Sequence, residues 1–268
     1  MEVIDLSWWK LALAAVLVVL LAAFTALGRL GITRSLLVAA TRTVIQLALI
    51  GVVLEALFAA RGLLWVALLA MVMLLVAGRE VMARQQRRLT GAWAFGIGTG
   101  AMFVSSFSVT VLALVVVIGP QPWYQPQYAI PLLGMMLGNT MTGVALGLDR
   151  LNDAVWRQRA VIENRLMLGQ PWQTAVADIR RDAMRNGMIP SINAMAAAGI
   201  VSLPGMMTGQ ILAGSPPAVA VKYQILIMFV ITVGTGFGTL MAVTLGSRRL
   251  FDRRERLRLD RLVSNAPG

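Results

Sequence analysis

Seven long apolar runs, separated by polar segments, dominate the hydrophobic pattern of this chain. They cover residues 8–27, 42–58, 63–77, 93–118, 129–148, 189–213 and 218–245. An apolar α-helix of roughly 20 residues can cross the hydrocarbon core of a bilayer, and the helix satisfies its own backbone polar groups there. The pattern therefore predicts an all-α, polytopic membrane protein with about seven transmembrane helices. We expect residues 1–268 to form a single membrane domain.

One polar segment, residues 149–188, is much longer than the others and holds seven arginines and five acidic residues. Such a segment cannot lie in lipid. Its apolar positions recur with a helical period on both sides of residues 169–171, which predicts two amphipathic helices. The first apolar face is Leu151, Val155, Ile162 and Leu166, and the second is Trp172, Val176, Ile179 and Ala183. The segment is therefore expected to be a folded docking element.

The distribution of arginine predicts the orientation of the chain. If the seven runs alternate across the membrane, segments 28–41, 78–92, 149–188 and the tail 246–268 fall on one side, and these are rich in arginine. Segments 59–62, 119–128 and 214–217 fall on the other side and hold a single arginine, Arg61. Arginine-rich loops stay in the cytoplasm. The N-terminus is thus predicted outside, the C-terminus inside, and the location is the inner (cytoplasmic) membrane.

Composition agrees with a protein whose main partner is the lipid bilayer. Hydrophobic residues make up 58% of the chain and charged residues 13%, and the mean hydropathy is +0.75. The net charge of +12 does not predict a nucleic-acid partner, because the arginines flank apolar runs and do not form a basic face with aromatic residues. The chain has no cysteine and no histidine, so it lacks thiolate and imidazole ligands. No cofactor and no metal site is predicted.

Polar residues inside the apolar runs are candidates for a substrate pathway, because a polar group in hydrocarbon is costly and usually faces a partner or a cavity. Two alternatives stay open. Arg42 could extend its head group to the membrane interface, and Asn139 could equally bind a neighbouring helix. The candidate pathway residues are Arg42, Gln46, Asn139, Thr142 and Gln210.

Two further features concern helix geometry. Pro204 removes a backbone donor and Gly205 loosens the chain, so the sixth run is expected to contain a kink or break that could act as a hinge. The hydroxyl groups of the fourth run are expected to donate to carbonyl groups of their own helix. They belong to Ser105, Ser106, Ser108 and Thr110.

Motifs of catalysis are missing from the sequence. It contains no G-x-x-x-x-G-K-[ST] phosphate loop, H-E-x-x-H or G-x-S-x-G pattern, and its two lysines are Lys10 and Lys222. An enzyme is therefore not expected, and neither is hydrolysis of ATP by this chain. The ionisable residues of the runs, Arg42 and Glu55, stand near run ends, which argues against a carrier driven by protons or ions.

Three stretches carry a resemblance to a known family: RTVIQL (42–47), GMMLGNTMTGVALGLDRL (134–151) and LPGMMTGQILAGSPPAVAVKYQI (203–225). They resemble the FetB-type permeases of bacterial ABC transporters associated with iron export. Plant relatives of that family are linked to aluminium tolerance and nucleotide-sugar transport. The resemblance covers essentially the whole chain. It implies a permease that pairs with itself and with two copies of a separate cytoplasmic ATPase.

The long polar segment fits this resemblance. Importer permeases dock their ATPase through a loop of the form E-A-A-x3-G-x9-I-x-L-P, and Glu163, Gly169 and Ile179 match its spacing. Asn164 and Arg165 replace the two alanines, and the Leu-Pro pair is absent at its place. We interpret residues 163–186 as the coupling element. The expected ATPase-coupling residues are Glu163, Gly169, Trp172, Val176 and Ile179.

The sequence thus predicts the membrane subunit of an ABC transporter that exports iron, another metal or a small polar solute. A self-powered secondary transporter and a non-transporting assembly or signalling subunit stay open as alternatives.

Overall fold

A computed structural model describes residues 7–60 and 62–264. Arg61 and the last four residues of the expected tail therefore lie outside the described residues. The helices are α1 (Trp8–Leu27), α2 (Thr33–Ala60), α3 (Leu63–Ala83), α4 (Ala92–Met102), α5 (Ser108–Leu112), α6 (Pro126–Arg157), α7 (Arg159–Met167), α8 (Trp172–Ala175), α9 (Ala177–Ala197), α10 (Gly205–Leu212) and α11 (Pro217–Arg249). Two π-helical segments, η1 (Phe103–Phe107) and η2 (Ala113–Ile118), continue α4 and α5, and a 3-10 turn, η3, covers Leu259–Arg261.

Within the described residues, six helical segments are long and apolar enough to cross a membrane. They are Trp9–Leu27, Thr33–Phe58, Leu63–Ala83, Ala92–Ile118, Pro126–Arg157 and Pro217–Arg249. The expected fold class, an all-α multi-pass membrane protein, is confirmed. The count of seven crossings stays a prediction, because the seventh would be α9, whose first half carries the charges of the polar segment.

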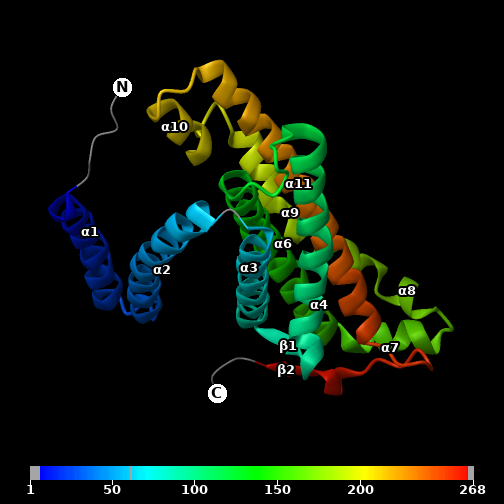
Figure 1. Cartoon of the computed structure of the whole chain (residues 1–268). Coiled ribbons are helices and arrows are strands. Elements are labelled where there is room, and N and C mark those ends of the chain that lie inside the picture. The colour runs from blue at the N-terminus through cyan, green and yellow to red at the C-terminus, as the bar shows by residue number, and fades with distance from the viewer. Residues whose placement is uncertain (1–6, 61, 265–268) are drawn as a thin grey trace.

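The centre of the molecule is formed by α6, α9 and α11, with α3 and α4 beside them and the α1–α2 hairpin at one side (Figure 1). Glycine allows the central helices to approach closely. A Cβ atom added at Gly187 of α9 would lie 2.5 Å from the carbonyl oxygen of Gly143 in α6 and 2.5 Å from Cγ2 of Thr239 in α11. The backbones of α6 and α9 therefore touch, as in other membrane helix pairs that meet at small residues.

Several helix boundaries differ from the sequence-based expectation. The first helix of the polar segment is not separate, because α6 continues from the membrane run through Asp149 to Arg157. The second is continuous with the sixth run, because α9 extends from Ala177 to Ala197. The junction at Asp149 contains no residue that would end a helix. In α9 the helix continues although Pro190 lies inside it. The expected interruption at residues 169–171 does separate α7 from α8.

The sixth run is divided into two helices. After Ala197 the chain turns, and α10 begins at Gly205 with Pro204 as its N-cap residue. A backbone bond from the Gly199 N–H to the Ser202 carbonyl oxygen, 2.9 Å long, closes this turn. The turn and α10 lie at the end of the molecule opposite to β1 and β2 (Figure 1).

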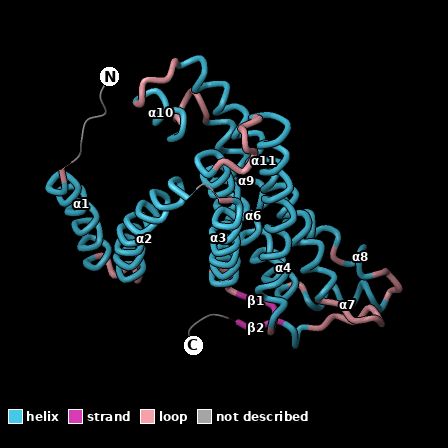
Figure 2. The backbone as a smooth tube through the Cα atoms, in the orientation of Figure 1, coloured by secondary structure: helices cyan, strands magenta, loops and turns pink. Residues whose placement is uncertain are grey.

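A small antiparallel sheet, in which β1 (Arg87–Leu89) pairs with β2 (Leu262–Ser264), was not predicted. Arg88 stands opposite Val263, and Figure 2 shows the two strands at the lower end of the molecule. The strands are only three residues long, too short for a recognisable alternating pattern. Their pairing fastens the end of the tail beside the α3–α4 connection.

The hydroxyl groups of the fourth run do not behave as expected. Within the described residues, Ser105, Ser106 and Thr110 are buried and their hydroxyl oxygens have no hydrogen-bond partner. The expectation that Ser105, Ser106 and Thr110 donate to their own helix is wrong, and the expectation for Ser108 stays a prediction. It assumed a regular α-helix, whereas this stretch alternates between α and π geometry, which displaces the carbonyls that such hydroxyls use.

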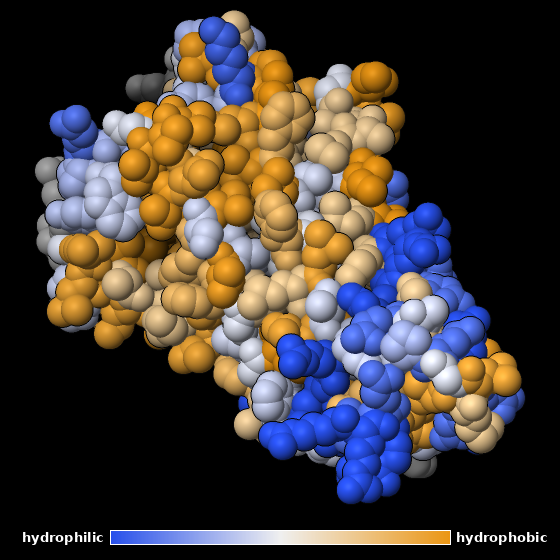
Figure 3. All heavy atoms as spheres, turned by 90° about the vertical axis from the view of Figure 1, so that its right-hand side faces the viewer, coloured by the Kyte–Doolittle hydropathy of each residue, from blue (hydrophilic) through white to orange (hydrophobic). Residues whose placement is uncertain are grey.

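Polar residues gather at one end of the molecule. In Figure 3 the hydrophilic surface occupies the lower end, and the face above it is largely hydrophobic. The α1–α2 turn, the β1–β2 sheet and α7 all lie at this lower end in Figure 1. These are the arginine-rich segments of the chain, and we call this part the basic end.

Candidate functional site

The basic end is held together by a polar network between α6 and the α3–α4 connection. The buried Asn152 side chain donates from Nδ2 to Oε1 of Gln85 (3.2 Å) and to the carbonyl oxygen of Arg87 (3.0 Å). The Gln86 N–H donates to Oδ1 of Asp149 at 2.7 Å. The guanidinium of Arg87 also lies 4.4 Å from the ring centroid of Trp156. The end of α6 is therefore rigidly attached to β1.

Helices α7 and α8 and the start of α9 contain the predicted coupling element, residues 163–186. The predicted apolar faces in this part of the chain are buried, with Ile162, Val176 and Ile179 at most 4% exposed. Arg165 binds Asp178 through two bonds of 3.1 and 2.9 Å and donates to the Ala175 carbonyl oxygen at 2.9 Å. The hydrogen bond from Arg165 lowers the pKa of Asp178. These contacts fold the element back on itself across the break at residues 169–171.

The chain after α11 packs against the coupling element. The ring of Trp172 stacks on that of Phe251, with centroids 5.4 Å apart and an interplanar angle of 27°. The backbone N–H of Trp172 donates to Oε2 of Glu255 at 3.1 Å. The tail is thus ordered and forms one wall of a pocket of about 620 Å³, whose other wall is the turn between α7 and α8. The sequence indicated that the tail is rich in arginine, but it did not predict that the tail folds against the coupling element.

The tip of the coupling element exposes apolar side chains. Met167 is 77% exposed and Leu168 is 82% exposed, and the exposed residues Glu163, Gly169 and Gln170 surround them. Among the expected coupling residues, Glu163 and Gly169 are therefore at the surface, and Trp172 is half-buried. Val176 and Ile179 lie in the interior, where they can anchor the element but cannot contact a partner.

A groove of about 700 Å³ opens between α2, α3 and α6. The candidate pathway residues Arg42 and Gln46 line it together with Glu80. Nη2 of Arg42 lies 2.7 Å from Oε1 of Glu80 and forms an ion pair with it. Sequence reasoning missed Glu80 because the third run was expected to end at Ala77, whereas α3 continues to Ala83. The signal available in the sequence was an acidic residue three positions after the end of the apolar run.

The remaining candidate residues lie elsewhere. Asn139 shares a smaller pocket of about 200 Å³ with Pro204, Gly205 and Gln224, between α6, α9, α10 and α11. Its Nδ2 donates to the Met135 carbonyl oxygen at 2.8 Å, but the side chain is exposed. The structure thus brings Arg42 together with Gln46, and Asn139 together with Pro204 and Gly205. It does not bring these two groups into one cavity.

Thr142 and Gln210 stand apart from both groups. The hydroxyl of Thr142 donates to the Gly138 carbonyl oxygen at 3.1 Å, which is a local bond within α6. The side-chain oxygen of Gln210, in α10, is buried and has no hydrogen-bond partner in the described part of the chain.

Comparison with known proteins identifies the family. The family model described as an uncharacterised protein family, UPF0014, matches residues 8–251. The chain belongs to the UPF0014 family. The match runs from α1 to the turn after α11, so it includes the groove, the Asn139 pocket and the coupling element. No solved structure shows a significant match.

Curated UPF0014 relatives cover almost the whole chain. The UPF0014 membrane protein slr1647 of Synechocystis is 38% identical, covering 95% of this chain and 97% of its own. The probable iron export permease protein FetB of Escherichia coli is 31% identical, covering 92% and 93%. Protein ALUMINUM SENSITIVE 3 of Arabidopsis thaliana is 30% identical, covering 86% and 82%. The resemblance drawn from the sequence is confirmed, and this UPF0014 chain is a multi-pass membrane protein.

Proposed function

We propose that this UPF0014 protein is the membrane-spanning permease subunit of an ABC transporter. It exports iron, another metal or a small polar solute across the inner membrane, and a separate cytoplasmic ATPase supplies the energy. The observation that carries the proposal is the folded coupling element at the basic end, with Met167 and Leu168 exposed at its tip. Exposed apolar side chains rimmed by polar ones are typical of a protein contact. The similarity to a protein named as a probable iron export permease supports the transport role.

The continuity of the helices suggests how movement passes from the ATPase to the membrane. The coupling element joins the end of α6 to the start of α9. The same two helices line the Asn139 pocket, and α6 also lines the groove with Arg42. A displacement of the tip tilts both helices as rods. Packed helices have discrete alternative arrangements, so this tilt switches the pathway between two accessible states.

The proposed transporter contains two copies of this chain and two ATPase subunits. The amide of Asn139 is exposed in the single chain, although it lies within a membrane-crossing helix. An amide facing hydrocarbon is costly, so a second copy or a transported solute is expected to cover it. Either arrangement places Asn139 at the centre of the assembly and not at the lipid.

The test is transport by the purified protein in vesicles, with and without an ATPase subunit encoded beside it. We expect ATP-dependent flux of at least one metal or small polar solute when both are present, and none with either alone. A strain that lacks the gene should accumulate the same solute when several metals are compared. Flux without an ATPase would instead establish a secondary transporter. Failure of the purified protein to retain any ATPase would favour an assembly or signalling subunit.

A further inference from the structure

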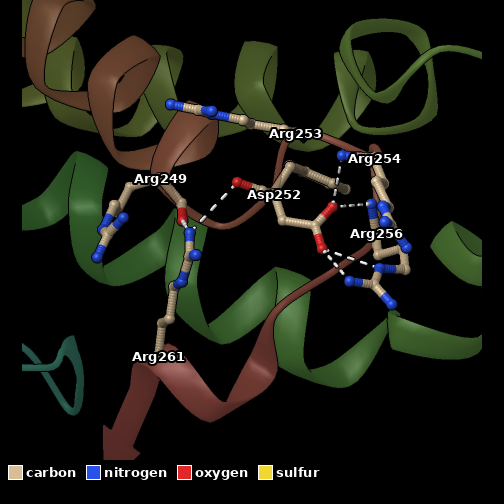
Figure 4. A pocket seen from close by; sticks show the side chains of 7 residues that line it. Arg249, Asp252, Arg253, Arg254, Arg256 and Arg261 are labelled. Atoms are coloured by element: carbon tan, nitrogen blue, oxygen red, sulfur yellow. Dashed lines mark hydrogen bonds and ion pairs between the residues drawn. The ribbon is translucent and has the colours of Figure 1, made fainter.

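The tail beyond α11 forms a pocket whose lining is dominated by arginine. It measures about 400 Å³ and is lined by Arg249, Phe251, Asp252, Arg253, Arg254, Arg256 and Arg261. In Figure 4, Arg249 and Arg261 lie on one side, Arg254 and Arg256 on the other, and Arg253 crosses above Asp252. Five arginines and one aspartate give the lining a formal excess of four positive charges. A volume of about 400 Å³ is large enough for a small ligand.

The single carboxylate of the pocket is already fully used. Oδ1 of Asp252 accepts the backbone N–H groups of Arg254 (2.9 Å) and Arg256 (3.0 Å), and Oδ2 accepts Nε of Arg256 at 2.8 Å. The bond from the backbone of Arg256 contributes most to lowering the pKa of Asp252 to about 2. Asp252 therefore shapes the turn and neutralises Arg256, and it is not free to neutralise the other arginines.

The other four guanidinium groups have no carboxylate partner among the described residues. Arg261 donates from Nη1 to the carbonyl oxygens of Arg249 (2.7 Å) and Phe251 (3.3 Å), which fixes its position through neutral partners. The nearby carboxylate of Asp260 attracts Arg261 but is hydrogen-bonded to Arg258. Within the described chain, the side chains of Arg253 and Arg254 have neither an ion pair nor a hydrogen bond. Guanidinium groups held close together repel one another, and a multiply charged anion removes that repulsion.

The pocket is built on ordered backbone and does not belong to a loose basic extension. The Glu255 N–H donates to the Asp252 carbonyl oxygen at 3.1 Å, and Glu255 adopts a left-handed conformation with φ 58°. A residue other than glycine adopts this conformation where its surroundings impose it. The Glu255 carboxylate also accepts the backbone N–H of Trp172 at 3.1 Å, which holds this turn against α8. Consecutive arginines 253 and 254 are thereby presented from a fixed turn.

The pocket also lies next to the membrane-crossing helices. The guanidinium of Arg249, the last residue of α11, stands 4.7 Å from the ring centroid of Trp93 at the start of α4. Tryptophan at the end of a membrane helix commonly marks the level of the lipid head groups. A phosphate group can therefore reach the pocket either from the cytoplasm or from a neighbouring lipid.

We infer that this arginine pocket is a binding site for a phosphate group, carried by an anionic phospholipid head group or by a free phosphate. The four guanidinium groups without a carboxylate partner supply donors in planar forks that match phosphate oxygens. Occupation of the site would stabilise the tail, and through the Trp172 contacts it would stabilise the coupling element. The inference does not depend on the transport function.

The experiment measures thermal stability of the full chain in neutral detergent at constant ionic strength. The probes are inorganic phosphate and phosphatidylglycerol, with chloride and phosphatidylcholine as references. We expect one phosphate probe to raise Tm by about 4 °C or more at saturation, because a ligand stabilises the state that it binds. A response to inorganic phosphate assigns a free anion. A response to phosphatidylglycerol alone, with that lipid found by mass spectrometry in the purified protein, assigns a head group.

The variants locate the site. The double substitution Arg253→Gln with Arg254→Gln should abolish the Tm shift, whereas Arg34→Gln with Arg79→Gln, which removes two exposed arginines from α2 and α3, should retain it. If the first variant does not fold, Arg253→Lys with Arg254→Lys keeps the charge but loses the planar forks, and the shift should shrink. Equal responses of both glutamine variants, or no response of the wild type, would overturn the inference. So would loss of ATPase retention without any phosphate response, which would assign the pocket to a protein contact.

Discussion

At Gly187 three helices meet without room for a side chain. A Cβ atom there would lie 2.5 Å from the Gly143 carbonyl oxygen, which belongs to backbone that cannot rotate away. We therefore expect Gly187→Ala to separate α6 from α9 and to destabilise the protein by about 1–3 kcal/mol, the usual cost of overpacking. Thermal unfolding of the purified variant measures this. Gly100→Ala in α4 is the control, because its Cβ atom would meet nothing within 4 Å, and it should leave Tm unchanged or slightly raised.

The ion pair between Arg42 and Glu80 offers a second prediction at the level of single residues. Both side chains are partly exposed, at 52% and 26%, so the pair should contribute little to folding, below about 1 kcal/mol. Arg42→Ala should therefore leave Tm nearly unchanged. If the groove belongs to the pathway, the same substitution should slow transport about fivefold, the equivalent of about 1 kcal/mol.

The charge exchange Arg42→Glu with Glu80→Arg tests whether transport depends on the ion pair itself or only on other features of the groove. It should restore part of the transport, because the ion pair can form in the reverse sense. Normal transport by both Arg42→Ala and Asn139→Leu would show that neither the groove nor the Asn139 pocket belongs to the pathway.

At the level of elements, the tip of the coupling element makes the most direct prediction. The double substitution Met167→Asp with Leu168→Asp should abolish retention of the ATPase during purification, because it places two charges in an apolar contact. Thermal stability should hardly change, because both side chains are exposed. The matched control is Ile200→Asp with Val201→Asp, two residues that are 91% and 82% exposed at the opposite end of the molecule. Equal ATPase retention by the two variants would rule out the tip as the docking surface.

The elements also show how far the sequence could predict this fold. The apolar runs and the buried faces with Val155, Ile162 and Val176 followed directly from periodicity, because burial in lipid or in a core selects apolar residues at fixed spacing. Periodicity did not predict where the helices end. Asp149 lies inside α6, because a charged residue is compatible with a helix that continues out of the membrane. The same holds for Glu80 beyond the end of the third apolar run.

Contacts between distant segments were beyond reach of the sequence. In α6 a Cβ atom added at Gly138 would meet open space, whereas the backbone at Gly143 touches that of Gly187 in α9. Spacing identifies a small-residue face, but it does not say which partner the face meets. For the same reason, no local pattern announced that Trp172 would stack on Phe251 and thereby order the tail.

At the level of the whole molecule, the orientation in the membrane can be tested because the chain contains no cysteine. A single introduced cysteine is then the one site for a thiol reagent that does not cross the membrane. Gln121, in the loop before α6, and Gln170, in the turn between α7 and α8, are both exposed. This loop and this turn lie at opposite ends of the fold (Figure 1). With the N-terminus outside, Gln121→Cys should be labelled in intact cells, and Gln170→Cys should be labelled only after the membrane is opened.

A third cysteine decides whether α9 is a seventh crossing. Its apolar part is short, but one side of α9, with Ala183, Gly187 and Ser191, is buried, and α9 packs against both α6 and α11. Polar groups on that side can be satisfied by protein and need not face lipid. If α9 crosses, the exposed Ser202 in the turn before α10 lies outside, and Ser202→Cys should be labelled in intact cells like Gln121→Cys. If α9 stays on the cytoplasmic side, Ser202→Cys should follow Gln170→Cys. Since α11 would then carry the tail outward, the arginine-rich tail would face the exterior, against the charge distribution that orients the other loops.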